Sequence, residues 1–325
     1  MSATRALGID LGGTKILAAV VDVEDGTVLG RAKRRTRSDR GAEALVERTV
    51  ECAREALEEA GASADDLAGA CAAVAGQIDR GAGIVRGAPN LASDLLDLPL
   101  ADRLAADLGV RVTLANDVEA GAVGEATHGA GVDRDFVAIF VGTGVGGALV
   151  EGGRPRSGRS GTAGEVGHMV VQYGGRVCGC GGRGHLEAYA SRTAITRVLL
   201  AELDRGRESV LREVVEAHEG EGPPLRSRQL AEAVEAGDEL TTEVIGEAAD
   251  LLGSAIASIA DLLNPERFVL GGGLVDRLDF IVERAGRRAQ LDVLPAARGS
   301  FDVVRAALGD DAGVVGAAVL GAATR

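Results

Sequence analysis

Apolar residues along the chain alternate between two spacings, one typical of strands and the other of helices. Short apolar runs at 6–9, 16–23 and 136–141 predict buried strands. Longer stretches, with apolar residues three and four positions apart, predict amphipathic helices at 42–60, 100–108, 118–127 and 241–263. Because predicted strands and helices take turns along the chain, the pattern indicates a mixed α/β fold.

Turn-forming residues mark where these elements end. Gly61 follows the first predicted helix, and Asn264-Pro265 follows the longest one, where proline cannot continue a helix. The charged stretch 31–40 is typical of a solvated hairpin edge. Further strands are expected at 67–74, 111–115, 148–151 and 267–270.

The layout of the first twenty residues returns later in the chain. Strand 6–9, a glycine turn and strand 16–23 have their counterpart in strand 136–141, the glycine-rich run 142–147 and strand 148–151. We interpret this repeat as two related halves. The length of 325 residues agrees, since domains usually contain about 100–200 residues.

Composition excludes several classes of protein. The 49 acidic and 35 basic residues give a net charge of −14, which argues against nucleic acid as a partner. Hydrophobic residues make up 46% of the chain, too many for a disordered protein, but no apolar run approaches the roughly 20 residues of a membrane span. The N-terminus has no secretory signal pattern, so we expect a cytoplasmic protein that binds no membrane.

The segment 10–15 reads Asp-Leu-Gly-Gly-Thr-Lys and forms the turn of the first predicted hairpin. Two glycines let backbone N–H groups approach an anion, and the lysine adds a positive charge. The aspartate at the strand end is placed to hold magnesium beside phosphates. Taken alone, the motif is better explained as an ordinary hairpin turn, and it lacks the spacing of a P-loop.

The second glycine turn satisfies Gly-x-Gly-x-x-Gly with Gly142, Gly144 and Gly147. A dinucleotide-binding fingerprint requires a helix to open directly after the glycines, whereas residues 148–151 continue as a strand. We therefore reject a nicotinamide cofactor. The interpretation is a second phosphate-binding hairpin, one in each half of the protein.

With these motifs in place, the sequence resembles sugar kinases of the ROK family (repressor, open reading frame, kinase), most closely their bacterial glucokinase branch. The most specific segment is Glu-Val-Gly-His at 165–168 followed by Cys-Gly-Cys-Gly-Gly-Arg-Gly-His-Leu-Glu at 178–187. Further family marks are Pro89-Asn90, Asn116-Asp117 and Asn264-Pro265-Glu266 before a Gly-Gly-Gly turn at 271–273. His185 stands where the family has a third cysteine.

The resemblance implies an actin-like ATPase (ribonuclease H-like) fold, with two α/β domains around a central cleft. We expect the small domain to comprise residues 1–117, rejoined by a C-terminal helix at about 312–325, and the large domain residues 118–311. The implied cofactors are ATP, Mg²⁺ and a structural Zn²⁺. Residues expected at the ATP and magnesium site are Asp10, Gly12, Gly13, Thr14, Lys15, Gly142, Thr143, Gly144, Gly272 and Gly273.

Sugar-contacting positions also follow from the resemblance: Gly76, Asn90, Asn116, Asp117, Glu165, His168 and Glu187. Asp117 is the expected catalytic base, because it lies where a strand ends and a helix begins, and a helix N-terminus favours the ionised carboxylate. The alternative is that Asp117 only caps the helix. The expected zinc ligands are His168, Cys178, Cys180 and His185, since zinc accepts imidazole as well as thiolate; otherwise the two cysteines are free thiols in a glycine loop.

These features predict a glucokinase that transfers the γ-phosphoryl group of ATP to the 6-hydroxyl of glucose. Alternatives are a kinase for fructose, mannose, N-acetylglucosamine or N-acetylmannosamine, and a glucokinase that uses polyphosphate. A sugar-sensing repressor is disfavoured, because only nine residues precede Asp10. The resemblance also implies a homodimer, with a tetramer as the alternative.

Overall fold

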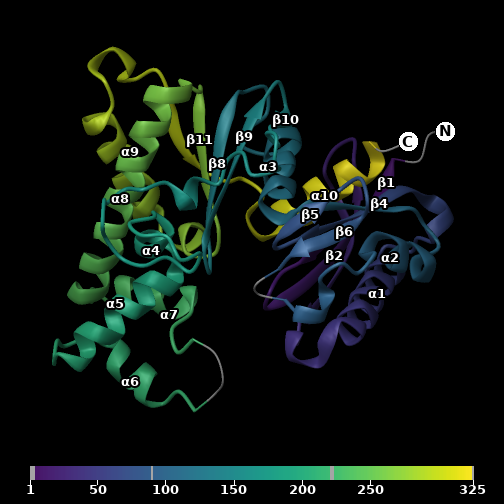
Figure 1. Ribbon diagram of the computed structural model, residues 1–325, viewed down its shortest axis with the longest axis horizontal. Coiled ribbons are helices and arrows are strands. Elements are labelled where there is room, and N and C mark those ends of the chain that lie inside the picture. The colour runs from purple at the N-terminus through teal and green to yellow at the C-terminus, as the bar shows by residue number, and fades with distance from the viewer. Residues whose placement is uncertain (1–3, 89–90, 220–222, 324–325) are drawn as a thin grey trace. The chain divides into compact units, whose positions relative to one another are not determined.

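The computed structural model describes residues 4–88, 91–219 and 223–323, and within it the chain forms two compact units (Figure 1). The first unit comprises residues 1–133, 153–155 and 310–325, and the second comprises 134–152 and 156–309. Each unit is built around a five-stranded sheet.

The sheet of the first unit has the strand order β3-β2-β1-β4-β7. The first three strands pair antiparallel, and the other two run parallel to β1. Apolar side chains occupy both faces of β1 and β4, which explains their continuous hydrophobic runs. The strands are β1 (Arg5–Leu11), β2 (Lys15–Asp22), β3 (Val28–Arg35), β4 (Leu67–Val74) and β7 (Val112–Asn116).

Helices cover both faces of this sheet. The core on one face unites side chains of α1 and α2, and the core on the other face unites side chains of α3 and α10. In Figure 1, α10 is the yellow helix among the purple and blue elements that precede it by some 180 residues or more in the chain. The helices are α1 (Gly41–Glu59), α2 (Leu100–Leu108), α3 (Asp117–His128) and α10 (Ala312–Ala323).

The second five-stranded sheet has the order β10-β9-β8-β11-β12, and all of its strands except the two-residue β10 belong to the second unit. Again the hairpin strands β8 and β9 pair antiparallel, while β8, β11 and β12 run parallel to one another. The strands are β8 (Phe136–Val141), β9 (Val145–Glu151), β10 (Arg154–Pro155), β11 (Arg267–Gly271) and β12 (Asp302–Arg305). The shared order of the two sheets agrees with the predicted repeat, and the mixed α/β class is confirmed.

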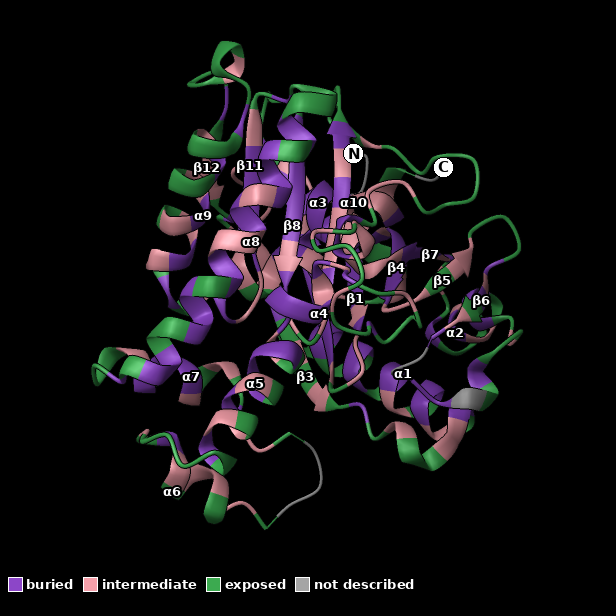
Figure 2. Ribbon diagram, turned by 60° about the vertical axis from the view of Figure 1, so that its left-hand side comes forward, coloured by how far each residue is buried: buried purple, intermediate pink, exposed green. Residues whose placement is uncertain are grey.

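One long helix, α8, organises the core of the second unit. Its buried residues pack with those of α5, α7, α9 and the strands β8 and β11. Figure 2 shows this division, with buried residues along β8 and exposed positions on the outer turns of α8 and α9. The helices are α4 (Glu187–Ala190), α5 (Arg192–Asp204), α6 (Leu211–Glu216), α7 (Ser227–Glu235), α8 (Glu239–Leu263) and α9 (Asp279–Asp292).

Most predicted elements are present within one or two residues of their expected bounds. The charged stretch from residue 31 belongs partly to the edge strand β3, whose outward positions are exposed, as a solvated hairpin edge requires. The sequence analysis missed β12 and the hairpin of β5 (Gln77–Asp79) and β6 (Ile84–Gly87), since strands of three or four residues carry too little periodicity. By packing, α3 and the residues through Asp133 belong to the first unit.

Candidate active site and metal cluster

The first glycine turn connects β1 and β2 and is closed by its own backbone. The Gly12 N–H donates to the Lys15 carbonyl at 3.0 Å. Thr36, at the end of β3, steadies the turn from outside: its hydroxyl donates to the Gly12 carbonyl at 2.5 Å, and its N–H to the Thr14 carbonyl at 3.1 Å. The turn is therefore held in shape without a ligand.

Asp10 and Lys15 flank this turn with opposite charges. Lys15 Nζ lies 3.0 Å from Asp310 Oδ1, just before α10, so its charge is engaged within the same unit. Burial raises the pKa of the Asp10 carboxyl to about 6, although the nearby Lys15 lowers it. A divalent cation at this carboxylate would offset the cost of ionising it.

Asn116 caps α3, leaving Asp117 as the first residue of the helix. Asn116 Oδ1 accepts from the N–H groups of Val118 and Glu119 at 3.0 and 3.2 Å, and its amide donates to the Gly76 carbonyl at 3.0 Å. Three predicted sugar-site positions, Gly76, Asn116 and Asp117, are thus joined within the first unit. Because Asn116 performs the capping, that alternative role is not needed to explain Asp117.

The second and third glycine turns lie at neighbouring strand ends of the second unit. Strands β8 and β11 are parallel, with Phe140 opposite Gly271, so their carboxyl ends meet at one edge of the sheet. Gly142 follows the first strand, and Gly272, with φ at +98°, follows the second. A Cβ atom on Gly272 would lie 2.4 Å from the Val141 carbonyl oxygen, so only glycine fits there.

Glu187 connects the second glycine turn with the cysteine loop. Its Oε2 accepts from the Val145 N–H at 3.1 Å, and its Oε1 lies 3.4 Å from Cys178 Sγ. A Cβ atom on Gly144 would come within 2.3 Å of Glu187 Oε2. The predicted sugar-contacting carboxylate therefore also supports the backbone of the turn.

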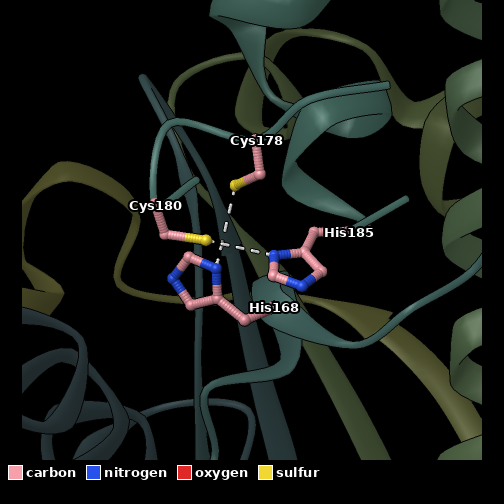
Figure 3. A group of neighbouring side chains, drawn as sticks. All are labelled: His168, Cys178, Cys180 and His185. Carbon is pink, nitrogen blue, oxygen red and sulfur yellow. Dashed lines mark hydrogen bonds between the residues drawn. The ribbon is translucent and has the colours of Figure 1, made fainter. Parts of the chain in front are cut away.

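The four predicted zinc ligands form one cluster (Figure 3). Their nearest ligand atoms all lie within 4.8 Å of one another. Cys178 Sγ is 3.8 Å from His168 Nδ1, and Cys180 Sγ is 3.2 Å from His185 Nδ1. Tetrahedral zinc with Zn–S of about 2.3 Å and Zn–N of about 2.0 Å requires sulfur–nitrogen separations of roughly 3.6 Å, so the donor set fits zinc.

Glycine makes this cluster possible around His185. A Cβ atom on Gly182 would lie 2.3 Å from His185 Cε1, so the imidazole uses space that only glycine leaves open. Burial raises the pKa of the Cys178 thiol to about 11, and the Glu187 carboxylate adds to the increase. A bound cation would favour the thiolate and oppose this shift.

Two predicted sugar-contacting positions, Glu165 and Asn90, remain. Glu165 is exposed at the start of the short helix 166–168, where its carbonyl accepts from the His168 N–H at 3.0 Å. Asn90 lies outside the described residues.

The sequence analysis missed Arg192, whose guanidinium donates to Thr143 Oγ1 at 2.8 Å. Nothing in its local sequence, at the start of a helix, indicated that contact.

A repeated sheet with a glycine turn after its first strand defines the class: a duplicated α/β protein of the actin-like fold. The ROK family model matches residues 6–323. A glucokinase of Thermotoga maritima is 35% identical over 98% of this chain and 97% of its own length. A glucokinase of Streptomyces coelicolor is 33% identical over 97% of this chain and 96% of its own.

Solved structures agree. The ROK family glucokinase from Streptomyces griseus, in complex with glucose and AMPPNP, superposes with a TM-score of 0.84 at 32% identity, covering 98% of this chain and 99% of that one. The chain belongs to the ROK family. The resemblance inferred from the motifs is therefore confirmed, as is the actin-like fold class.

Proposed function

We propose that this protein is an ATP-dependent glucokinase. The observation that carries the proposal is the family match over residues 6–323, together with glucokinases 33–35% identical along nearly their whole length. The neighbour solved with glucose and AMPPNP supports the same substrate and donor. Glycine turns of a kind that can bind phosphate support the proposal in each unit, with one in the first unit and two in the second.

Asp117 is the proposed general base. It would accept the proton of the sugar 6-hydroxyl as that oxygen bonds to the γ-phosphorus of ATP and the bond to the ADP oxygen breaks. Its place in the first turn of α3 favours the carboxylate form. Asn116 fixes the start of this helix through both the oxygen and the nitrogen of its side-chain amide, and so determines where the base lies.

Asp10 is the proposed ligand of magnesium. A carboxylate oxygen suits this hard cation, and the cation supplies charge neutralisation on the phosphates. The first glycine turn, at residues 12–15, would hold those phosphates through its backbone. For Lys15 to contribute its charge, its ammonium group must leave Asp310 or bridge Asp310 and the phosphate.

Zinc is the proposed occupant of the cysteine and histidine cluster. Two thiolates and two imidazoles form an ordinary structural ligand set. Because His185 lies two residues before Glu187, a bound metal would restrict the carboxylate that supports Val145 and is proposed to contact the sugar. The remaining proposed sugar contacts are Gly76, Asn90, Asn116, Glu165 and His168.

A coupled assay over a panel of sugars and donors tests the function. Glucose with ATP should give the highest kcat/KM among glucose, mannose, fructose, N-acetylglucosamine and N-acetylmannosamine, and ATP should exceed polyphosphate. A higher kcat/KM for another sugar would replace the proposed substrate. The absence of transfer to every sugar would reject the kinase itself.

Elemental analysis tests the metal. Protein purified without chelator should contain about one zinc per chain, as expected for one closed structural site. His185→Ala should lower this occupancy and the melting temperature together, because metal binding contributes to folding. Full activity without zinc would reject its role, and full zinc occupancy in His185→Ala would exclude His185 as a ligand.

A further inference from the structure

Arg192 begins α5, and its side chain lies against the second glycine turn. Its Nη2 donates to Thr143 Oγ1 at 2.8 Å, and its backbone N–H donates to the Gly142 carbonyl at 3.0 Å. Thr193 adds a neutral bond, from its hydroxyl to the Thr143 carbonyl at 2.7 Å. The start of α5 thus places one positive charge on a turn proposed to bind phosphate.

Among the described residues, the guanidinium of Arg192 meets only neutral acceptors. Besides the Thr143 hydroxyl, the Arg192 guanidinium donates to the Leu225 carbonyl at 3.3 Å. No described residue forms an ion pair with Arg192, whereas Arg284 of the same unit makes two hydrogen bonds to Asp250. Burial, followed by the proximity of Arg226, lowers the pKa of Arg192. A partly buried cation with no carboxylate partner favours an anionic ligand.

Arg226 adds a second positive charge near Arg192, on the segment that leads to the third glycine turn. It directly follows Leu225 and precedes Ser227, the first residue of α7. A Cβ atom on Gly273 would lie 3.6 Å from Ser227 Oγ, so the start of α7 adjoins that turn. The segment 225–227 therefore reaches from Arg192 to Gly273 within one unit.

The two turns share an edge of the sheet, because β8 and β11 are neighbouring parallel strands. Ligands of open α/β sheets bind at the carboxyl ends of such strands. A guanidinium group can donate two parallel hydrogen bonds to phosphate oxygens. These charge-assisted bonds are stronger than the bonds that a guanidinium makes to neutral acceptors. The turns supply backbone N–H groups, and the arginines supply charge.

We infer that Arg192 binds the phosphate chain of the nucleotide donor at the second glycine turn, with Arg226 as a second cation beside it. This inference deepens the proposed function and rests on it for the identity of the nucleotide. The Thr143 hydroxyl orients the guanidinium before the ligand arrives. Arg192 then contributes to the affinity for phosphates and not to the affinity for the nucleoside.

Calorimetric titration of the full chain with ADP and with adenosine, without sugar, tests this inference. Arg192→Gln should weaken ADP binding about 10- to 100-fold, the usual effect of losing a hydrogen bond to a charged group. Adenosine binding should change less than about twofold, a difference too small for a lost hydrogen bond. Arg197→Gln is the matched control, because Arg197 is an exposed arginine five residues further along α5, and it should leave both affinities unchanged.

Thr193→Val separates a charge contact from support of the turn. It removes the neutral bond to the Thr143 carbonyl and leaves the guanidinium in place. The dependence of ADP affinity on salt should flatten in Arg192→Gln but not in Thr193→Val, because only the former loses a charge that salt screens. Arg192→Lys should recover part of the ADP affinity.

Two outcomes overturn the inference. One is an equal loss of ADP and adenosine affinity in Arg192→Gln, which would indicate damage to the fold. The other is ADP affinity unchanged from wild type. If wild-type protein phosphorylates no sugar yet shows the Arg192-dependent preference for ADP over adenosine, the proposed function fails and the inference stands. If it phosphorylates glucose and Arg192→Gln binds ADP normally, only the inference fails.

Discussion

Asp117 is the residue on which the proposed chemistry depends most directly. Asp117→Asn should leave glucose affinity within a few-fold and lower kcat by about 10²–10⁴, the usual contribution of general-base catalysis. The amide keeps the size of the side chain and cannot accept the hydroxyl proton. Turnover rates and glucose dissociation constants, measured on the same preparation, check this prediction.

The matched control for Asp117→Asn is Asn116→Ala. It removes the cap of α3 and the bond to Gly76, and should cost about 1 kcal/mol of stability. Its loss of kcat should be smaller, because the carboxylate remains. If Asp117→Asn retained more than about a tenth of wild-type turnover, well short of a general base's usual contribution, the base would be another residue.

Asp10 should make the stability of the protein depend on pH. Its pKa of about 6 in the folded state lies above the ordinary 3.8 of the unfolded chain. A raised carboxyl pKa means that the folded state binds the proton more tightly, so this group's contribution to the free energy of unfolding is present below pH 4 and is lost as pH rises to 6. In magnesium-free buffer, the free energy of unfolding of Asp10→Asn should not show this decrease as pH rises.

Denaturant titrations at pH 4 and pH 7.5 measure the difference. The stability of Asp10→Asn relative to wild type should rise by about 1–2 kcal/mol between the two pH values, less than the ~3 kcal/mol of two full pKa units because the residue keeps some contact with water. The kinase activity of Asp10→Asn should also be lower than that of wild type. A pH-independent difference would show that Asp10 titrates normally.

At the scale of one element, the second glycine turn offers two positions with different surroundings. A Cβ atom on Gly142 would meet nothing within 4 Å, whereas one on Gly144 would meet Glu187 Oε2 at 2.3 Å. Gly142→Ala should therefore raise the KM for ATP alone, by crowding the phosphates. Gly144→Ala should raise the KM values of both ATP and glucose, because it displaces Glu187.

The sequence analysis placed Gly144 at the ATP and magnesium site alone. The structure changes that expectation, since a side chain at Gly144 reaches Glu187 before it reaches solvent. Steady-state kinetics of the two variants distinguish the cases. Identical effects of Gly142→Ala and Gly144→Ala would argue that Glu187 does not contact the sugar.

A second feature at the scale of single elements is the close contact between helices α3 and α10. A Cβ atom on Gly316 would lie 1.7 Å from the Ala120 carbonyl oxygen, so Gly316→Ala should destabilise the protein by about 3 kcal/mol, as overpacking does. Gly286→Ala in α9 is the control, because its Cβ would lie an ordinary 3.5 Å from Val303 Cβ. It should be neutral or stabilising by up to about 1 kcal/mol, from helix propensity. Thermal unfolding of both variants checks the contrast.

At the scale of the whole molecule, the expected assembly is a homodimer. Light scattering should give about twice the chain mass of 33.0 kDa. A mass of 33.0 kDa at working concentration would reject the dimer, and four times that mass would favour the tetramer.

Among the described residues, no helix combines the length and the hydrophobicity that a membrane span requires.

Local features of the chain were sufficient to predict most of its elements, its mixed α/β class and its glycine motifs. Hydrophobic periodicity is set over a few turns, so β4, β8 and α2 were predicted at their observed bounds. The family resemblance predicted the cluster from His168 to His185, and its four candidate ligands lie within eighteen residues, with both cysteines in one loop. The glycine turns followed from the conformational freedom of glycine between strands.

Only tertiary structure decided which distant residues meet. Lys15 reaches Asp310 across nearly the whole chain, Glu187 supports Val145, and Arg192 contacts Thr143, although no spacing in the sequence links these pairs. Such contacts depend on how helices dock on sheets, which burial of apolar surface determines over the entire unit. Periodicity records which face of an element is buried, but not which side chain from elsewhere lies opposite it.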